Sequence, residues 1–226
     1  MAHKVKSLVA SERVQLQWQR RVSAEYGSAA IASQLLHWLI QLGVSPDLLY
    51  QCQEVVREEL MHTDLSREVY LAAGGGDQAI FIHPQQLVIP HAEGEELIYR
   101  ALEFTADFFC CGETVAAPLF RAMVEGTTID IAKKSLMRIV KDEEGHGEFG
   151  WELLEELLSI STSDQRNRLK ERVSGFVSRI VSTNQMNETI RDDETIWGLL
   201  SGKVYADITA TTASEVLVPN FKSLLK

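Results

Sequence analysis

Glu59-Leu60-Met61-His62 and Glu143-Glu144-Gly145-His146 are two copies of one pattern, a glutamate followed three residues later by a histidine. On an α-helix, residues three apart lie on one face, with about 5–6 Å between their Cβ atoms. One carboxylate and one imidazole of each copy can therefore reach the same ion. A single copy is a weak sign, because Glu and His are common on protein surfaces. The second copy makes a shared metal site the leading interpretation.

Each copy is preceded by a helical segment that carries a lone glutamate. Glu25 stands among small residues in the stretch 24–30, and Glu113 stands in the apolar stretch 108–115. Glu25 lies about 27 Å from the helix end expected at Gly43, and Glu59 lies about 20 Å from Pro46, at 1.5 Å per residue. Antiparallel helices would thus bring these side chains to a similar depth. A buried carboxylate without a partner is costly, and a metal supplies one. The alternative is a structural polar core.

Hydrophobic periodicity and helix-ending signals divide the chain into helical segments. The expected helices cover residues 11–43, 46–73, 93–124, 128–159 and 163–183, and one or two short helices are expected within 184–226. Gly74-Gly75-Gly76, Pro84 and Pro90 mark residues 74–91 as a long crossover, which lets the third helix begin at the same end as the second. Pro118 is expected to bend the third helix. The prediction is a four-helix bundle over 11–158 with a C-terminal helical extension, 159–226, in one domain, 1–226.

Composition restricts the partners. The 226 residues are 45% hydrophobic and 24% charged, and 22 basic against 32 acidic residues give a net charge of −10. That sign disfavours nucleic acid and anionic membranes. No apolar run is long enough to span a membrane, and no signal-peptide core stands at the N-terminus, so a cytoplasmic location is expected. Three cysteines, two of them adjacent, do not form a disulfide framework.

The string around the second copy resembles a known family. Residues 142–151, from Asp142 to Trp151, are similar to the Asp-Glu-x-x-His motif of the O2-activating, ferritin-like, non-haem di-iron carboxylate proteins. These include ribonucleotide reductase small subunits and p-aminobenzoate N-oxygenase. Residues 59–65 resemble the matching motif of the second helix, and Arg21-Val22-x-x-Glu25-Tyr26-Gly27 resembles the first helix of demethoxyubiquinone hydroxylases. The resemblance covers residues 11–158 and carries over the ligands, but no substrate.

The expected metal ligands are two lone glutamates and two glutamate–histidine pairs: Glu25, Glu59, His62, Glu113, Glu143 and His146. In the family, an acid preceding the motif often receives the ring N–H of a ligand histidine. We expect Asp142 to do so, and Glu58 is the candidate in the first copy. The chain departs from the N-oxygenases in having no histidine after His146. The 74–91 loop is also outside the common pattern.

These ligands suit two iron ions, and a Mn/Fe pair fits them equally well. The leading hypothesis is an oxidoreductase that uses O2 and an external electron donor to hydroxylate, N-oxygenate or oxidatively cleave a small organic substrate. The alternative is a ferritin-like ferroxidase that handles iron without an organic substrate. A third candidate is an interaction module that retains the site. A homodimer is a candidate assembly, but the sequence leaves the oligomeric state open.

Other residues have weaker claims to function. His83 and His91 flank the 74–91 loop and are candidates for contact with a substrate or a third metal, although loop histidines are more often simply exposed. His37, beside Trp38, is interpreted as a packing or surface residue.

Four residues close in sequence to the expected ligands are not expected to bind metal. Tyr26 adjoins Glu25, but adjacent helical positions point about 100° apart. Cys110 shares a face with Glu113 and is interpreted as a small buried apolar residue. Glu144 and Glu148 are interpreted as a solvated acidic face.

Overall fold

A computed structural model describes residues 10–182 and 190–226, and these residues form helices and connections without a β-strand. The first two helices make an antiparallel pair, α1 (Glu12–Leu42) and α2 (Pro46–Ala72). The Ser11 hydroxyl accepts a hydrogen bond from the Val14 amide at 3.3 Å, which caps α1. Gly43 ends the helix with φ 71°, in the left-handed region that glycine adopts without a steric penalty. The helices expected over 11–43 and 46–73 are confirmed.

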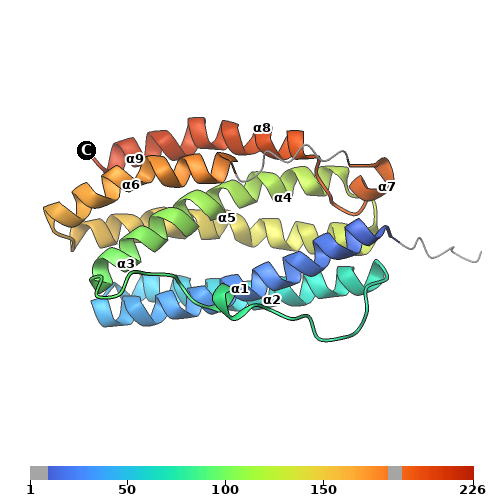
Figure 1. The fold of residues 1–226 in the computed structure, drawn as a ribbon, viewed down its shortest axis with the longest axis horizontal. Helices are drawn as coiled ribbons and strands as arrows, with labels where there is room; N and C mark the ends of the chain where they lie inside the picture. The colour runs from blue at the N-terminus through green and yellow to red at the C-terminus, as the bar shows by residue number, and fades with distance from the viewer. Residues whose placement is uncertain (1–9, 183–189) are drawn as a thin grey trace, which may run out of the picture.

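The connection from α2 to α3 runs back along the bundle (Figure 1). It contains one 3₁₀ turn, η1 (Pro84–Leu87), and the Ile89 amide donates to Gln34 Oε1 of α1 at 2.8 Å. The third helix therefore begins at the same end as α2, as predicted for a crossover. The run 79–82 forms no strand, and the Phe81 side chain is 78% exposed.

The third long helix changes its hydrogen-bonding pattern in the middle. It consists of α3 (Leu97–Phe104), a π-helical segment η2 (Thr105–Glu113) and α4 (Thr114–Gly126). It starts later than expected because Gly94 has φ 77°, which cannot continue a right-handed helix. The change in pattern lies at η2, whereas Pro118 sits inside regular α4. A π segment closes i→i+5 bonds and shifts the direction of the residues that follow.

The fourth helix, α5 (Asp130–Ser159), begins two residues after the expected start. Its N-cap position is Ile129, which makes no side-chain capping hydrogen bond, and the Thr127 hydroxyl donates to the Met123 carbonyl of α4 at 2.6 Å. Further along, α5 lies close against η2. A Cβ placed on Gly150 would be 2.6 Å from Phe109 Cβ, so only glycine permits this approach without displacement.

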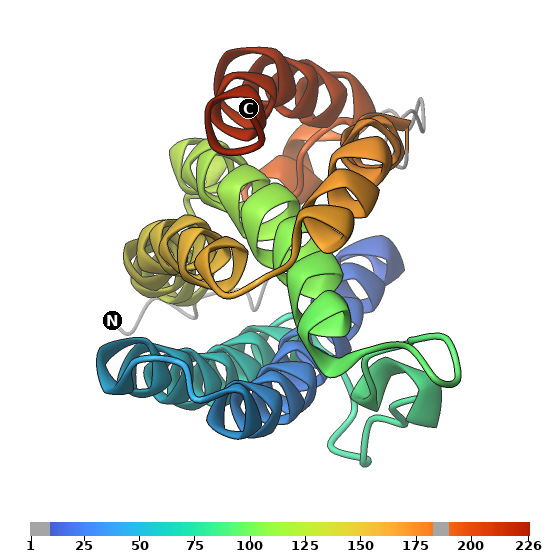
Figure 2. The same ribbon diagram turned by 90° about the vertical axis from the view of Figure 1, so that its left-hand side faces the viewer.

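The C-terminal residues form a further layer, on the side of α4 and α5 away from α1 and α2 (Figure 2). The elements are α6 (Ser163–Ser182), α7 (Asp192–Thr195), α8 (Gly202–Thr212), the π segment η3 (Ala213–Leu217) and α9 (Val218–Leu224). Residues 202–224 are helical without interruption, so the expectation of only short helices after 184 was wrong. Residues 183–189 lie outside the described part of the chain. The Ser11 hydroxyl donates to Glu194 at 2.8 Å, joining α7 to the start of α1.

Two apolar clusters fill the interior of the molecule. One contains Leu35 and Leu39 of α1 with Phe109 and Leu153, and the other contains Trp18, Leu136 and Trp197. On α1, α2 and α5, the glutamates and histidines of the predicted site lie in sequence between residues of the two clusters. Within residues 10–182 and 190–226, no helix has both the length and the apolarity needed to cross a membrane.

Candidate metal centre

Six buried acidic and imidazole side chains converge between α1, α2, α5 and the end of η2. They form two overlapping groups, and within each group the four candidate ligand atoms lie within 4.8 Å of one another. The His62 half consists of Glu25 and His62 with Glu59 and Glu143, and the His146 half consists of Glu113 and His146 with the same two shared glutamates. Each of the six residues is at most 7% exposed. These groups are positioned to hold metal, and they are the six residues the sequence singled out.

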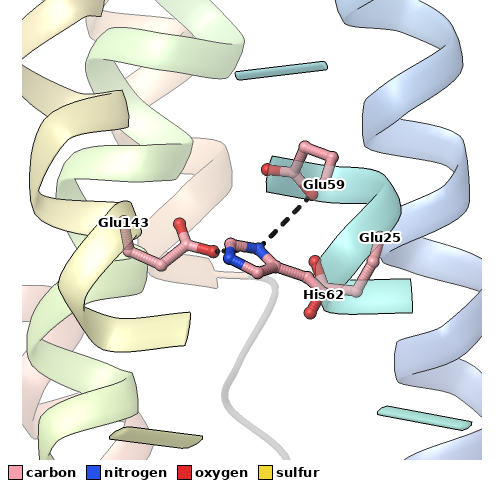
Figure 3. A group of neighbouring side chains, drawn as sticks. All are labelled: Glu25, Glu59, His62 and Glu143. Atoms are coloured by element: carbon pink, nitrogen blue, oxygen red, sulfur yellow. Dashed lines mark ion pairs between the residues drawn. The ribbon is translucent and has the colours of Figure 1, made fainter. Parts of the chain in front are cut away.

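Glu59 and Glu143 each present one oxygen to each histidine. Glu59 Oε2 lies 4.0 Å from His62 Nδ1, and its Oε1 lies 3.2 Å from His146 Nδ1. Glu143 Oε1 lies 3.5 Å from His62 Nδ1, and its Oε2 lies 3.7 Å from His146 Nδ1. Figure 3 shows Glu59 and Glu143 on opposite sides of the His62 ring. The two shared carboxylates therefore lie between two candidate metal positions, and each of these positions has one imidazole nitrogen beside it.

The far nitrogen of each imidazole is held by an acid from the opposite motif. His62 Nε2 lies 3.1 Å from Asp142 Oδ2, and His146 Nε2 lies 3.1 Å from Glu58 Oε2. Asp142 is paired in turn with Arg138, and Glu58 lies 3.6 Å from Arg57 Nη2. An acid on Nε2 fixes the ring orientation and leaves Nδ1 as the donor atom for a metal. Asp142 and Glu58 thus occupy the positions expected for them.

Unpartnered polar atoms test whether a metal fits this site. Four buried atoms at its centre make no hydrogen bond to any described residue: Glu59 Oε2, Glu143 Oε2, His62 Nδ1 and His146 Nδ1. His146 Nδ1 is 3.2 Å from Glu59 Oε1, but not in hydrogen-bonding geometry. Buried polar atoms without partners are rare in folded proteins because each costs free energy. All four face the shared centre, so a bound cation would satisfy them together.

The carboxyl groups of the cluster are electrostatically unfavourable without a cation. Burial, followed by the charges of Glu59 and Glu143, raises the pKa of Glu25 well above its ordinary value. Burial and the charge of Glu143 do the same to the pKa of Glu113. Burial also raises the pKa of Glu59, although the nearby histidines oppose it. Four ionised carboxylates so close together need positive charge between them.

The pKa values of the two histidines shift in opposite directions. Burial lowers the pKa of His62, and the neighbouring carboxylates only partly offset that effect. Burial also acts to lower the pKa of His146, but the hydrogen bond to Glu58 and the close carboxylates of Glu143 and Glu59 outweigh it and raise the pKa. Two like-charged imidazoliums 5.8 Å apart, between ring centroids, repel each other. The surroundings therefore shift the pKa values of the two imidazoles in opposite directions.

Arg21 is a residue near the site whose role the sequence did not reveal. It precedes Glu25 by one helical turn, and its guanidinium carbon lies 4.7 Å from the Trp18 ring and 4.8 Å from the Phe120 ring. Its Nη1 is buried without a hydrogen-bond partner. Burial lowers the pKa of Arg21, and attraction to Glu25 opposes this. Arg21 belongs to the string that resembles the first helix of the demethoxyubiquinone hydroxylases and precedes a predicted ligand by four residues, but neither feature predicted its contacts with Trp18 and Phe120.

Arg138 was also missed, although Arg138 and Asp142 have the i, i+4 spacing of a helical ion pair. The weaker candidates lie away from the cluster. His91 Nδ1 is 2.9 Å from the Ile89 carbonyl, and the His83 ring lies 6.1 Å from that of Phe81, centroid to centroid. Tyr26 is 41% exposed, and His37 is exposed.

The donor set contains no thiol. The Cys110 thiol is buried and donates to the Gly150 carbonyl at 3.3 Å, and burial raises its pKa well above the ordinary range, so it remains a neutral packing residue. Carboxylate oxygens with one imidazole nitrogen for each position are typical of iron and manganese, whereas structural zinc sites favour thiolates. The chain matches no known protein-family model, no curated protein and no solved structure.

Proposed function

We propose that the chain is a ferritin-like, non-haem di-iron oxidoreductase that uses O2 to oxidise a small organic substrate. The observation that carries the proposal is the pair of shared carboxylates, each with one oxygen toward each imidazole Nδ1. Two such positions, each with its own terminal glutamate, are the arrangement of di-iron carboxylate bundles. Two bound ferrous ions would supply the electrons with which O2 is activated.

The chain's own residues would prepare the site for that chemistry. The carboxylates of Glu25, Glu59, Glu113 and Glu143 would neutralise two divalent cations. Asp142 and Glu58 would hold the ligand histidines in one orientation through Nε2. The apolar clusters on the two sides would exclude water from the reacting centre.

A pocket beside the His146 half favours an enzyme over a protein that handles only iron. The pocket has a volume of about 410 Å³, and both Glu113 and Glu143 line it. That volume lies within the range of small-molecule sites. An organic substrate in this pocket would lie next to the metal centre. A ferroxidase has no organic substrate and needs no such pocket.

Anaerobic loading with Fe(II) tests the proposal. We expect two iron ions for each chain after desalting, followed by consumption of O2 when air is admitted. The exposed His37→Ala is the matched control for His62→Ala, which should bind less iron and consume less O2. Failure of the unaltered protein to bind iron, or failure of the iron-loaded protein to consume O2, would contradict the proposal.

The ferroxidase alternative predicts different results in the same preparation. A ferroxidase would oxidise many equivalents of Fe(II) for each chain and form a mineral, and size-exclusion chromatography would show a cage of many subunits. We expect instead a small assembly in which O2 consumption stops once the bound iron is oxidised and resumes when an external reductant is added.

A further inference from the structure

The pocket beside the His146 half connects the protein surface with the buried centre. Its lining comes from α4, α5 and the continuous helix of residues 202–224, and α4 lies beside each of the other two (Figure 2). Glu143, 2% exposed, lines it, and Glu143 Oε2 is one of the buried atoms without a hydrogen-bond partner. The pocket therefore extends from the surface to a buried polar side chain of the candidate metal centre.

Trp151, the aromatic residue of the pocket lining, is held in place by contacts within the chain. The Trp151 indole donates from Nε1 to Thr114 Oγ1 at 3.0 Å, and its ring meets that of Phe221 edge-on with centroids 4.8 Å apart. Because its N–H is occupied, Trp151 offers carbon surface to the pocket. Thr212 and Asn220, from the C-terminal helix, add a hydroxyl and an amide. This combination suits a compact organic molecule with an apolar body.

The charge at the mouth of the pocket is negative. Arg121 donates from Nε at 3.0 Å and from Nη2 at 2.5 Å to one oxygen of Glu144, so these two charges compensate each other. Glu148 also lines the pocket, is exposed, and has no ion-pair partner among residues 10–182 and 190–226. With the glutamates at the inner end engaged by metal, Glu148 would be the one uncompensated charge of the lining. Glu144 and Glu148, interpreted from the sequence as a solvated acidic face, therefore border a pocket.

We propose that this pocket binds the organic substrate and that the substrate is a small amine, held as its ammonium ion by Glu148 with its carbon body against Trp151. The proposal rests on the proposed function, whose pocket it assigns. An ammonium ion pairs with an accessible carboxylate, and the carbon body attached to it packs favourably against an aromatic ring. The overall charge of −10 also attracts cations and repels anions.

Three small molecules of similar shape, one positively charged, one neutral and one negatively charged, test the proposal. The protein is loaded with Mn(II), which is paramagnetic, and the proton relaxation of benzylamine, benzyl alcohol and benzoate is measured by NMR against metal-free protein. We expect the strongest saturable relaxation enhancement for benzylamine and the weakest for benzoate. Glu148→Gln should weaken benzylamine binding about two- to fivefold and leave benzyl alcohol unchanged.

Glu148→Lys should reverse the order of benzylamine and benzoate. The exposed Glu171 of α6 lies outside the pocket, so Glu171→Gln is the control and should behave as the unaltered protein. Equal binding of all three probes, preference for benzoate, or no response to Glu148→Gln would overturn the proposal. So would a Glu148→Gln variant that takes up Mn(II) more slowly but binds benzylamine normally, because the pocket would then be an entry route for metal. Failure of the unaltered protein to bind Mn(II) would instead contradict the metal centre on which the proposed function depends.

Discussion

The His62 half and the His146 half of the centre present the same donor types, but their surroundings differ. Behind His62 lies Asp142, whose side chain is 5% exposed and paired with Arg138; behind His146 lies Glu58, 15% exposed and nearer solvent. The pocket of about 410 Å³ borders Glu113, a candidate ligand of the His146 half only. The repeated motif therefore builds a nearly symmetric cage, and the packing around it makes one half tightly enclosed and the other accessible.

Removing a shared glutamate should have the largest effect, because it damages both halves at once. Glu143→Gln is expected to reduce bound metal from two ions for each chain to fewer than one, measured by elemental analysis after desalting. Glu25→Gln and Glu113→Gln should each cost one ion, from the His62 half and the His146 half respectively. A Glu143→Gln protein that still binds two ions would show that the centre is not shared. The melting temperature of each metal-free variant checks that it is folded.

The acids behind the histidines offer a more subtle way to separate the halves. Asp142→Asn and Glu58→Gln keep the side-chain shape but remove the charge, and loss of such a partner typically costs 10–100-fold in metal affinity. We expect the larger loss for Asp142→Asn because Asp142 is less exposed and its charge less screened. Stepwise competition with a chelator for Co(II) measures both. Equal losses would mean that the difference in burial has no energetic consequence.

A substitution at Gly150 of α5, which is not a candidate ligand, should alter the His146 half by displacing η2. Gly150→Ala would place its Cβ 2.6 Å from Phe109 Cβ and 2.9 Å from the Phe109 carbonyl carbon, so η2 must move. We expect about 1–3 kcal/mol of destabilisation in chemical denaturation, together with weaker metal binding at the His146 half. Gly145→Ala is the control, since nothing lies within 4 Å of its Cβ, and helix propensity should make it neutral or stabilising. A Gly150→Ala protein as stable as the control would contradict the close packing.

The smallest effect is expected in the pH dependence of the metal-free protein. A carboxyl group whose pKa is raised on folding stabilises the fold when protonated, and this contribution is lost as pH rises from 4.5, its ordinary value, through the folded pKa. Glu25, Glu113 and Glu59 act in this direction, as does His146, whose contribution is complete below 6.5. His62 opposes them, and Asp142, whose pKa is lowered, opposes them only below its ordinary value of 3.8.

The melting temperature of chelated protein should therefore fall between about pH 5 and pH 8. Glu25→Gln with Glu113→Gln should flatten the decline, and metal should abolish it. A melting temperature that rises over this range in chelated protein, with no response to the double substitution, would contradict the raised pKa values.

The difference between the halves also shows where sequence reasoning stops. The pattern Glu-x-x-His is local, since residues three apart on a helix share a face, and so the six clustered residues and the helices that carry them could be predicted. The π segment could not: Pro118 was the visible irregularity, yet it lies in regular α4, while the change in hydrogen bonding occurs at Thr105–Glu113. Gly150 permits α5 to approach this segment, and only packing reveals that contact.

The donor types, their spacing and their placement on four helices follow from the residues alone, because helical periodicity fixes which side chains share a face. The packing of the helices sets the pairing of Glu58 with the histidine of α5 and of Asp142 with the histidine of α2. It also decided that Arg21 lies between two aromatic rings and that Glu148 borders a pocket beside the His146 half. These contacts join residues far apart in the chain, and their distances depend on how whole helices pack against one another.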